Sequence, residues 1–399
     1  LFAFILKSYK LSFLTNALFE KKDHSPPNHY GQTTAVSTSP STPLKMDARI
    51  WSKLPEELLD LVLSFLPLKN FLILRSTCKR FKSLLFTSSF VFKHSSAFLL
   101  LSHPQCFRHF PLYDSDAATW RKLPLSLCAP LPCAAGAAAQ ASLLCASNGL
   151  LCFSLPNSFL VFNILTKSSR VIKFPDCPFG FELFSLISTP AGYNLFMLSS
   201  GSSSKSTLVY HSKARSWQKF DYTETILSDN CHQKGVHFKG CLYFVTPEPF
   251  SIVCFEFESG KWERPIPELP TELVFARLVS GGGGKKLYLI GGVGRNGIAR
   301  SLQVWELEFG GGMKWVEVES LPDRMCKKLM SVCFHNYEHL YCFWHQGLIC
   351  VCCYNWPEIL YFKISRRTWH WIPKCPSLPD KSSCGFRWFS FVPNFHSSA

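Results

Sequence analysis

The 399-residue sequence lacks the features that mark several large classes of protein. It has no uninterrupted apolar run of about 18 residues, so no membrane span and no membrane partner are predicted. Asn-x-Ser/Thr sequons are absent, which favours a protein of the nucleus, the cytoplasm or both. No G-x-S-x-G motif occurs, and Ser, His and Asp are too dispersed to indicate a catalytic triad. We therefore expect a protein that is not an enzyme.

Acidic residues are also scarce, with 27 Asp and Glu against 42 Lys and Arg, which gives a formal net charge of +15. The basic residues are scattered and gather only in pairs such as Lys285-Lys286 and Arg366-Arg367. A nucleic-acid-binding chain usually concentrates them in a patch or run. We expect no direct contact with nucleic acid, and we interpret the charge as attraction to acidic protein surfaces.

The 18 cysteines have no regular spacing, and many lie inside apolar runs. Buried, reduced thiols explain this pattern better than a disulfide framework. The densest group of metal-ligand residue types is Cys333, His335, His339, Cys342, His345, Cys350, Cys352 and Cys353. No pair of C-x-x-C motifs occurs there, and alternate residues of a strand point to opposite faces. We predict packed thiols and loop histidines, with no metal and no cofactor.

Residues 1–45 differ from the rest of the chain. The opening LFAFILKSYKLSFLTNALF has no initiator Met, and Lys7 and Lys10 interrupt its apolar run. Residues 23–45 are rich in Ser, Thr and Pro, a composition typical of disorder. We expect 1–45 to be a disordered extension and the organised part to begin at Met46.

Residues 51–90 carry a helical pattern. Leu54-Pro55-Glu56-Glu57 indicates a helix start, because proline fits the first turn and carboxylates complement the helix dipole there. Pro67 marks the end. The apolar residues between them cover an arc of roughly 200°, which is too wide for one packing surface. Part of the arc should therefore face a partner, and two further apolar runs predict a three-helix bundle.

This stretch resembles an F-box. The match runs through Leu54-Pro55, Glu57-Leu58-Leu59, Val62-Leu63, Leu66-Pro67, Arg75, Cys78-Lys79-Arg80 and Leu84, and it departs at Phe81, where many F-boxes carry Trp. The resemblance implies binding to the Skp-type adaptor of an SCF ubiquitin ligase and, through it, to a cullin. The adaptor-binding residues it implies are Leu54, Pro55, Glu57, Leu58, Leu59, Val62, Leu63, Leu66, Pro67, Cys78 and Phe81.

From about residue 97 the sequence consists of short apolar runs separated by turn residues, which is typical of many short strands. Trp residues recur near the end of each unit, at Trp120, Trp217, Trp262, Trp315 and Trp369. The spacings are 97, 45, 53 and 54 residues. Because the first is about twice the others, a unit that has lost its Trp is predicted around Val171.

Six units with this period predict the blades of a β-propeller, and the Trp residues should pack between blades. Such a ring has to close on itself, because each blade leaves edges exposed. The strand-like segment GFRWFSFVP, residues 385–393, is predicted to complete the blade that begins near residue 97.

Leu287-Tyr288-Leu289-Ile290-Gly291-Gly292 is similar to a kelch motif. With the F-box, residues 46–395 resemble the plant F-box/kelch-repeat family, near the branch that includes regulators of leaf and floral-organ development. The expected fold is α+β by domain: a disordered extension over 1–45, a small three-helix F-box over 46–95 and an all-β, six-bladed, kelch-like propeller over 96–399.

The segment 292–297 satisfies the G-x-G-x-x-G pattern of dinucleotide-binding proteins. That site requires a helix directly after the glycines, whereas residues 298–305 alternate like a strand. We interpret the glycines as a turn within a blade.

The sequence predicts a substrate-recognition subunit of an SCF-type ligase, whose propeller captures an unidentified target protein for ubiquitination. Two alternatives stay open: a propeller that senses a small molecule or performs chemistry, and a transcriptional cofactor that docks on a DNA-binding protein. The target-binding residues are not identified, but loops on a rigid scaffold usually carry recognition. The candidate loops are 199–206, 222–234, 293–300 and 310–313.

Overall fold

The computed structural model describes two parts of the chain. In the N-terminal part it describes residues 55–66, 73–74, 77–84, 87 and 90, and in the C-terminal part residues 96–399 with gaps at 107–108, 125–140, 176–180, 200–205, 222–232, 265–267, 310–311, 377 and 379–383. The chain divides into two compact units, residues 1–96 with 121–123 and the remainder of 97–399. No helix within the described residues is long and apolar enough to cross a membrane.

The N-terminal unit contains helices α4 (Glu56–Ser64) and α6 (Lys79–Leu84). Pro55 precedes α4 in an extended conformation, and Glu56 and Glu57 occupy its first turn, as the sequence predicts. Arg80 joins the two helices through ion pairs with Glu56 at 2.9 Å and Asp60 at 3.4 Å. Because these groups are largely exposed, the pairs add little to stability.

The predicted three-helix bundle lies partly in residues outside the described ranges, so the structure does not test it in full. Of the predicted second apolar run, residues 71–74, only Ile73 and Leu74 are described. Leu63, Leu74, Leu84 and Phe90 are buried, so the described pieces carry an apolar core. Helix α4 ends at Ser64, three residues before Pro67.

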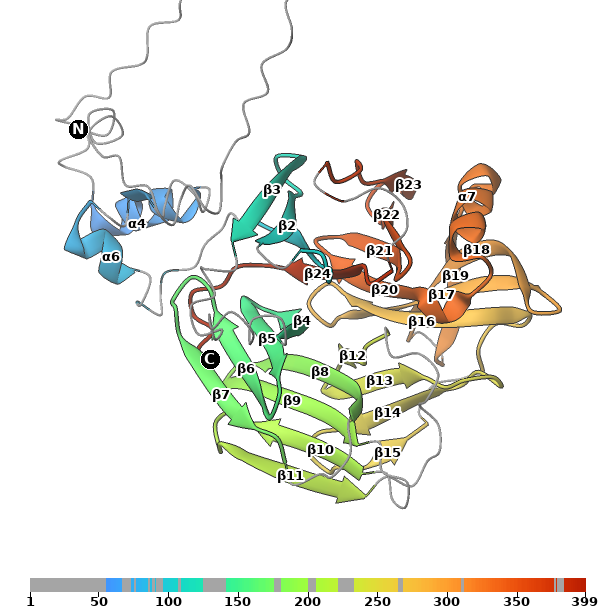
Figure 1. The fold of residues 1–399 in the computed structure, drawn as a ribbon, viewed down its shortest axis with the longest axis horizontal. Helices are drawn as coiled ribbons and strands as arrows, with labels where there is room; N and C mark the ends of the chain where they lie inside the picture. Colours follow the sequence, from blue (N-terminus) through green and yellow to red (C-terminus); the bar gives the residue numbers. More distant parts are fainter. Residues whose placement is uncertain are drawn as a thin grey trace, which may run out of the picture. The chain divides into compact units, whose positions relative to one another are not determined.

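The C-terminal part of the chain contains six four-stranded sheets (Figure 1). We number them as blades 1 to 6 and name their strands outward from the centre of the ring. Blades 1 to 3 are β24 (Arg387–Phe391), β1 (Phe98–Ser102), β2 (His109–Asp114) and β3 (Thr119–Pro124); β4 (Ser142–Ser147), β5 (Leu150–Leu155), β6 (Ser158–Asn163) and β7 (Ser169–Lys173); and β8 (Phe181–Thr189), β9 (Gly192–Ser199), β10 (Ser206–His211) and β11 (Ser216–Asp221).

Blades 4 to 6 follow the same order. They are β12 (Val236–Phe238), β13 (Cys241–Val245), β14 (Ile252–Glu256) and β15 (Trp262–Glu263); β16 (Leu273–Gly281), β17 (Lys286–Arg295), β18 (Ile298–Glu308) and β19 (Lys314–Ser320); and β20 (Leu340–His345), β21 (Leu348–Cys353), β22 (Trp356–Lys363) and β23 (Thr368–Trp371). The six predicted blades are therefore present.

The first strands of the blades line the centre of the ring. Strand β24 contacts β4 on one side and β20 on the other, and β4 contacts β8, β12 contacts β16, and β16 contacts β20. Strand β24 pairs antiparallel with β1 from Phe98↔Phe391 to Ser102↔Arg387. The predicted closure is confirmed, since one blade combines the last strand of the chain with the first three of the propeller.

The middle strands of the blades are buried on both faces, while the outermost strands are partly exposed. Strands β5 and β6 show four and five consecutive buried residues, whereas β11 has none. Blades pack face to face, so a middle strand meets a neighbour on each side. This is why the sequence shows continuous apolar runs there instead of alternation.

The recurrent Trp residues lie on the outermost strands and pack between blades, as predicted, and three of them hydrogen-bond to the preceding blade. The indole N–H of Trp120 donates to Pro373 O at 2.9 Å, that of Trp217 to Lys173 O at 3.0 Å, and that of Trp262 to Thr207 Oγ1 at 3.1 Å.

Blade 2 is the predicted unit that has lost its Trp, and its outermost strand β7 contains Val171 as expected. Val171 is 63 % exposed. Arg170 holds the second position of β7, the position that Trp217 holds in β11. Its Nη1 donates to Ser212 O at 2.9 Å, so an arginine fastens blade 2 to blade 3.

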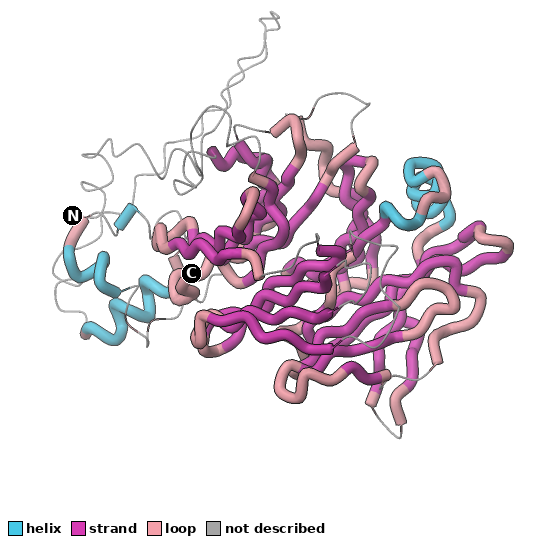
Figure 2. Tube along the Cα trace, turned by 60° about the horizontal axis from the view of Figure 1, so that its bottom comes forward, coloured by secondary structure: helices cyan, strands magenta, loops and turns pink. Residues whose placement is uncertain are grey.

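Helix α7 (Asp323–Cys333), on the link between blades 5 and 6, was not predicted (Figure 2). Its buried residues are Cys326, Leu329, Met330 and Cys333, which form one face at helical spacing. The 3-10 helix η3 (Tyr337–His339) follows it. This link is the only part of the described propeller where α-helical periodicity interrupts the strand pattern.

Candidate functional site

The apolar arc of α4 divides into a buried side and an exposed side. Leu63 is 1 % exposed and packs inside its own unit. Leu58, Leu61, Val62 and Phe65 are 48, 41, 42 and 56 % exposed, and their spacing of three, one and three residues places them along one face. We call these four residues the α4 stripe. Exposed apolar side chains gathered on one face are typical of protein-binding surfaces, which makes the α4 stripe the candidate site of this unit.

The predicted adaptor-binding residues fall into three groups. Pro55, Glu57, Leu58, Val62 and Cys78 are exposed; Leu59, Leu66 and Phe81 are half-buried; and Leu63 is buried. Leu54 and Pro67 lie outside the described residues. The site prediction omitted Leu61 and Phe65, although their spacing from Leu58 and Val62 identifies them as members of the same face.

Strand connections divide between the two faces of the propeller. The paired strands run antiparallel, so turns between the first and second and between the third and fourth strands emerge on one face. Turns between the second and third strands, and the links between blades, emerge on the other. The face with the links between blades is called the α7 face, because α7 lies on one of these links. The opposite face is called the C-terminal face, because residues 392–399 follow β24 there.

The strand ends that flank three of the four predicted recognition loops lie at the α7 face. The predicted loops 199–206 and 293–300 fall between second and third strands, and 222–234 falls between blades 3 and 4. The strand ends that flank 310–313 lie at the opposite face. Much of these loops, including 222–232, lies outside the described residues.

Residues 233–235 enter the central channel just before β12. Gln233 accepts a hydrogen bond from Cys342 N at 3.0 Å and donates to Leu278 O at 3.2 Å, which joins the first strands of blades 5 and 6. The Lys234 ammonium donates to Leu144 O of blade 2 and lies 4.4 Å from the centre of the Phe389 ring of blade 1. Two consecutive residues thus connect four blades from inside the ring.

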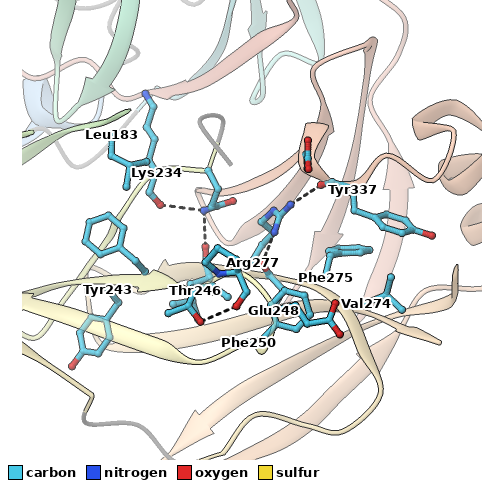
Figure 3. A pocket seen from close by; sticks show the side chains of 17 residues that line it. Leu183, Lys234, Tyr243, Thr246, Glu248, Phe250, Val274, Phe275, Arg277 and Tyr337 are labelled. Atoms are coloured by element: carbon cyan, nitrogen blue, oxygen red, sulfur yellow. Dashed lines mark hydrogen bonds between the residues drawn. The ribbon is translucent and has the colours of Figure 1, made fainter. Parts of the chain in front are cut away.

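A pocket of about 190 Å³ lies beside this segment and holds the buried Arg277 of β16. The guanidinium donates to the carbonyls of Leu340 at 2.7 Å, Ala276 at 2.6 Å and Tyr337 at 2.5 Å. Burial lowers the pKa of Arg277 to about 10. Figure 3 shows Arg277 held by Tyr337, with Lys234 directed away from it. Because its donors bind backbone, Arg277 is structural.

Of the predicted packed thiols and loop histidines, the thiols are buried in the core, whereas His345 is not in a loop but is the fully buried last residue of β20. Cys342 and Cys353 pack in the core between blades 5 and 6, while Cys350 and Cys352 pack between blades 6 and 1. Burial raises the pKa of Cys342 to about 12 and that of Cys353 to about 11, so both stay protonated thiols. Across the described ranges, no three His, Cys, Asp or Glu side chains gather as metal ligands would, and every cysteine is a free thiol.

The G-x-G-x-x-G segment is a β-hairpin, as predicted. Strands β17 and β18 pair on both sides of Asn296 and Gly297, whose φ values are +54° and +71°. Positive φ at both central residues is the requirement of a type I′ turn. Gly292 lies inside β17, where a side chain would collide with the Phe275 ring. No helix follows, so this segment lacks the geometry that binds pyrophosphate.

The chain matches two families. Residues 51–93 match the F-box domain, and residues 122–336 match the KIB1-4 beta-propeller. An F-box/kelch-repeat protein of Arabidopsis thaliana is 49 % identical over 383 residues, which cover 92 % of this chain and 93 % of that protein.

Two more distant relatives match along most of their length. Protein ABERRANT PANICLE ORGANIZATION 1 of Oryza sativa subsp. japonica is 28 % identical, covering 91 % of this chain and 93 % of that protein. Protein UNUSUAL FLORAL ORGANS of Arabidopsis thaliana is 26 % identical, covering 83 and 80 %. With its F-box and its propeller, the chain belongs to the plant F-box/kelch-repeat family, near the branch that contains these two relatives.

Proposed function

We propose that this chain is the substrate-recognition subunit of an SCF-type cullin ubiquitin ligase in the nucleus or cytoplasm. The α4 stripe, within residues that match the F-box, is the observation that carries the proposal. In this role the stripe binds a Skp-type adaptor, with Pro55, Glu57 and Cys78 around it. The propeller holds a target protein near the ubiquitin-charged enzyme, and the chain contributes proximity rather than chemistry.

If the α4 stripe binds the adaptor, a negative charge introduced into the stripe should weaken that binding. Leu58→Asp or Val62→Asp in the full chain should weaken binding of a Skp-type adaptor at least tenfold, because a buried interface has to desolvate the new carboxylate. The measurement is surface plasmon resonance with purified adaptor. Leu63→Asp is unsuitable as a test, because Leu63 is 1 % exposed and its replacement would unfold the unit.

Lys213→Asp is the matched control, since it places the same side chain in an exposed turn of the propeller. Circular dichroism and thermal unfolding of each variant establish that it is folded. If wild-type chain that is folded does not bind the adaptor, or if both stripe variants bind as wild type does, the proposal is wrong.

Capture of a target by the propeller is tested by proximity labelling in plant cells. Wild-type chain and the Leu58→Asp/Val62→Asp variant are compared, each with and without a proteasome inhibitor. A target should be labelled by both chains, and its abundance should fall only in cells with the wild-type chain and no inhibitor. A labelled set whose abundance is independent of the stripe would contradict the receptor role.

A further inference from the structure

A second cavity of about 330 Å³ lies in the central channel, next to the pocket that holds Arg277. It is bounded by the first strands of four blades, β4, β8, β20 and β24, and by Lys234. A volume of 300 to 1,000 Å³ is typical of small-molecule sites, so this cavity suits a ligand at the lower end of that size range. Its walls come from the most constrained part of the ring, which makes the site preformed.

The walls combine apolar surface with two cations. The apolar and aromatic side chains around the cavity include Leu144, Ala146, Leu183, Phe184, Phe343, Trp344 and Phe389. Lys234 and Arg387 supply the positive charge, and Ser390 adds a hydroxyl. No Asp or Glu lines the cavity within the described residues, so its field is positive.

The ammonium group of Lys234 lies in a largely buried position, where a positive charge is unfavourable. Part of its surface faces the cavities, but burial among the first strands, together with a smaller effect of the nearby Arg387, lowers its pKa to about 8, while the nearby Cys145 acts in the opposite direction. One carbonyl, Leu144 O, and the face of the Phe389 ring stabilise the ammonium. No ion pair joins Lys234 or Arg387 to a carboxylate in the described part of the chain. An anion in the cavity would supply the charge compensation that a buried cation ordinarily requires.

We propose that this cavity binds a small organic anion with a flat apolar body, of the aromatic carboxylate class. The carboxylate binds Lys234 and Arg387, and the ring packs against Phe184, Phe343 and Phe389. The proposal concerns the propeller alone and stands or falls independently of adaptor binding by the α4 stripe.

The test uses the full chain and 2-naphthoate as the probe, followed by isothermal titration calorimetry, with 2-naphthamide as its uncharged counterpart. We expect one site per chain for 2-naphthoate and at least tenfold weaker binding of the amide. Lys234→Gln and Arg387→Gln should each weaken 2-naphthoate at least tenfold, while Lys285→Gln, at an exposed turn, should leave its affinity unchanged.

Ala146→Phe is an independent variant, because it fills the cavity without changing either charge. It should abolish binding, and thermal unfolding should confirm that the variant is folded. The proposal is overturned if folded wild-type chain binds neither 2-naphthoate nor the smaller benzoate at millimolar concentration. Equal binding of acid and amide, or binding that survives both Lys234→Gln and Ala146→Phe, would overturn it as well.

Discussion

His345 is a neutral imidazole at the seam where the ring closes. It is the last residue of β20, and its two ring nitrogens hydrogen-bond to Ser115 Oγ at 2.7 Å and Ser390 Oγ at 2.9 Å, both in blade 1. Its side chain is fully buried, and burial lowers the pKa of His345 from 6.5 to about 4. The folded protein therefore stabilises only the neutral form.

This environment predicts a loss of stability in acid. Below pH 6.5 the unfolded chain takes up a proton at His345 that the folded chain does not bind until about pH 4, so stability falls across that window. The full effect amounts to roughly 3 kcal/mol. His345→Gln should be less stable than wild type at pH 7.5, and the difference should shrink as the pH falls to 4.5, as measured by urea unfolding.

His370→Gln serves as the control, since His370 is exposed and hydrogen-bonds to Thr368 on its own strand. The free energy of unfolding of His370→Gln should stay close to that of wild type at both pH values. If the difference in free energy of unfolding between His345→Gln and wild type did not change with pH, the role assigned to His345 would be wrong.

At the scale of elements, residues 392–399 form a latch between blades 1 and 2. Asn163, at the end of β6, donates through Nδ2 to Asn394 O at 2.8 Å and Ser397 O at 2.7 Å. Its Oδ1 accepts from Leu165 N at 2.9 Å and Thr166 N at 3.4 Å. Every hydrogen-bonding group of this fully buried amide is used.

Loss of the Asn163 amide should weaken the latch. Asn163→Ala leaves buried carbonyls and amides without partners, and we expect it to cost about 2–3 kcal/mol of propeller stability. Ser397→Ala removes one exposed bond, from its Oγ to Asn148 O, and should cost less than about 1 kcal/mol. Chemical denaturation followed by Trp fluorescence measures both. Equal costs for the two variants would show that burial of Asn163 contributes nothing.

The elements that the sequence predicted well are those with a repeated signal. Short apolar runs and the spacing of the Trp residues predicted six blades, and the segment 385–393 predicted the closing strand. Helix α7 was missed because four buried residues in one short link do not stand out against the strand pattern around them. Residues 233 and 234 fall in a predicted recognition loop, but their role as a bridge was missed for another reason. A Gln and a Lys that bridge blades carry no periodicity, and only the folded ring brings Leu144, Leu278 and Phe389 around them.

Of the two candidate sites, the sequence indicated the α4 stripe in part and the central cavity not at all. The over-wide arc of α4 indicated an outward-facing side, but which residues occupy it depends on the packing of Leu63 and its neighbours. The central cavity had no sequence signal, because four strands distant in the chain contribute its walls.

At the scale of the whole molecule, stability of the propeller depends on ring closure. Without β24, the edge of β1 is unpaired, and Leu99, Leu100 and Leu101, each 0 % exposed, lose the strand that covers them. A chain truncated after residue 384 should therefore aggregate or elute as a large oligomer in size-exclusion chromatography.

Addition of the missing strand in trans is the control for this prediction. Co-expression of the truncated chain with residues 385–399, fused to a carrier protein, should restore a monomeric propeller that retains the carrier. A truncated chain that is monomeric and unfolds at the wild-type temperature would show that closure by β24 is dispensable.

Because β24 is the last strand of the chain, the propeller can close only at the end of translation. The F-box unit leaves the ribosome early, whereas blade 1 waits for the last strand of the propeller, on the order of tens of seconds later at ordinary translation rates. Until then both the central channel and the α7 face are incomplete. A ribosome that stops early therefore releases a chain that has its F-box but no closed propeller. Under the proposed function, such a chain would compete for the adaptor without delivering a target.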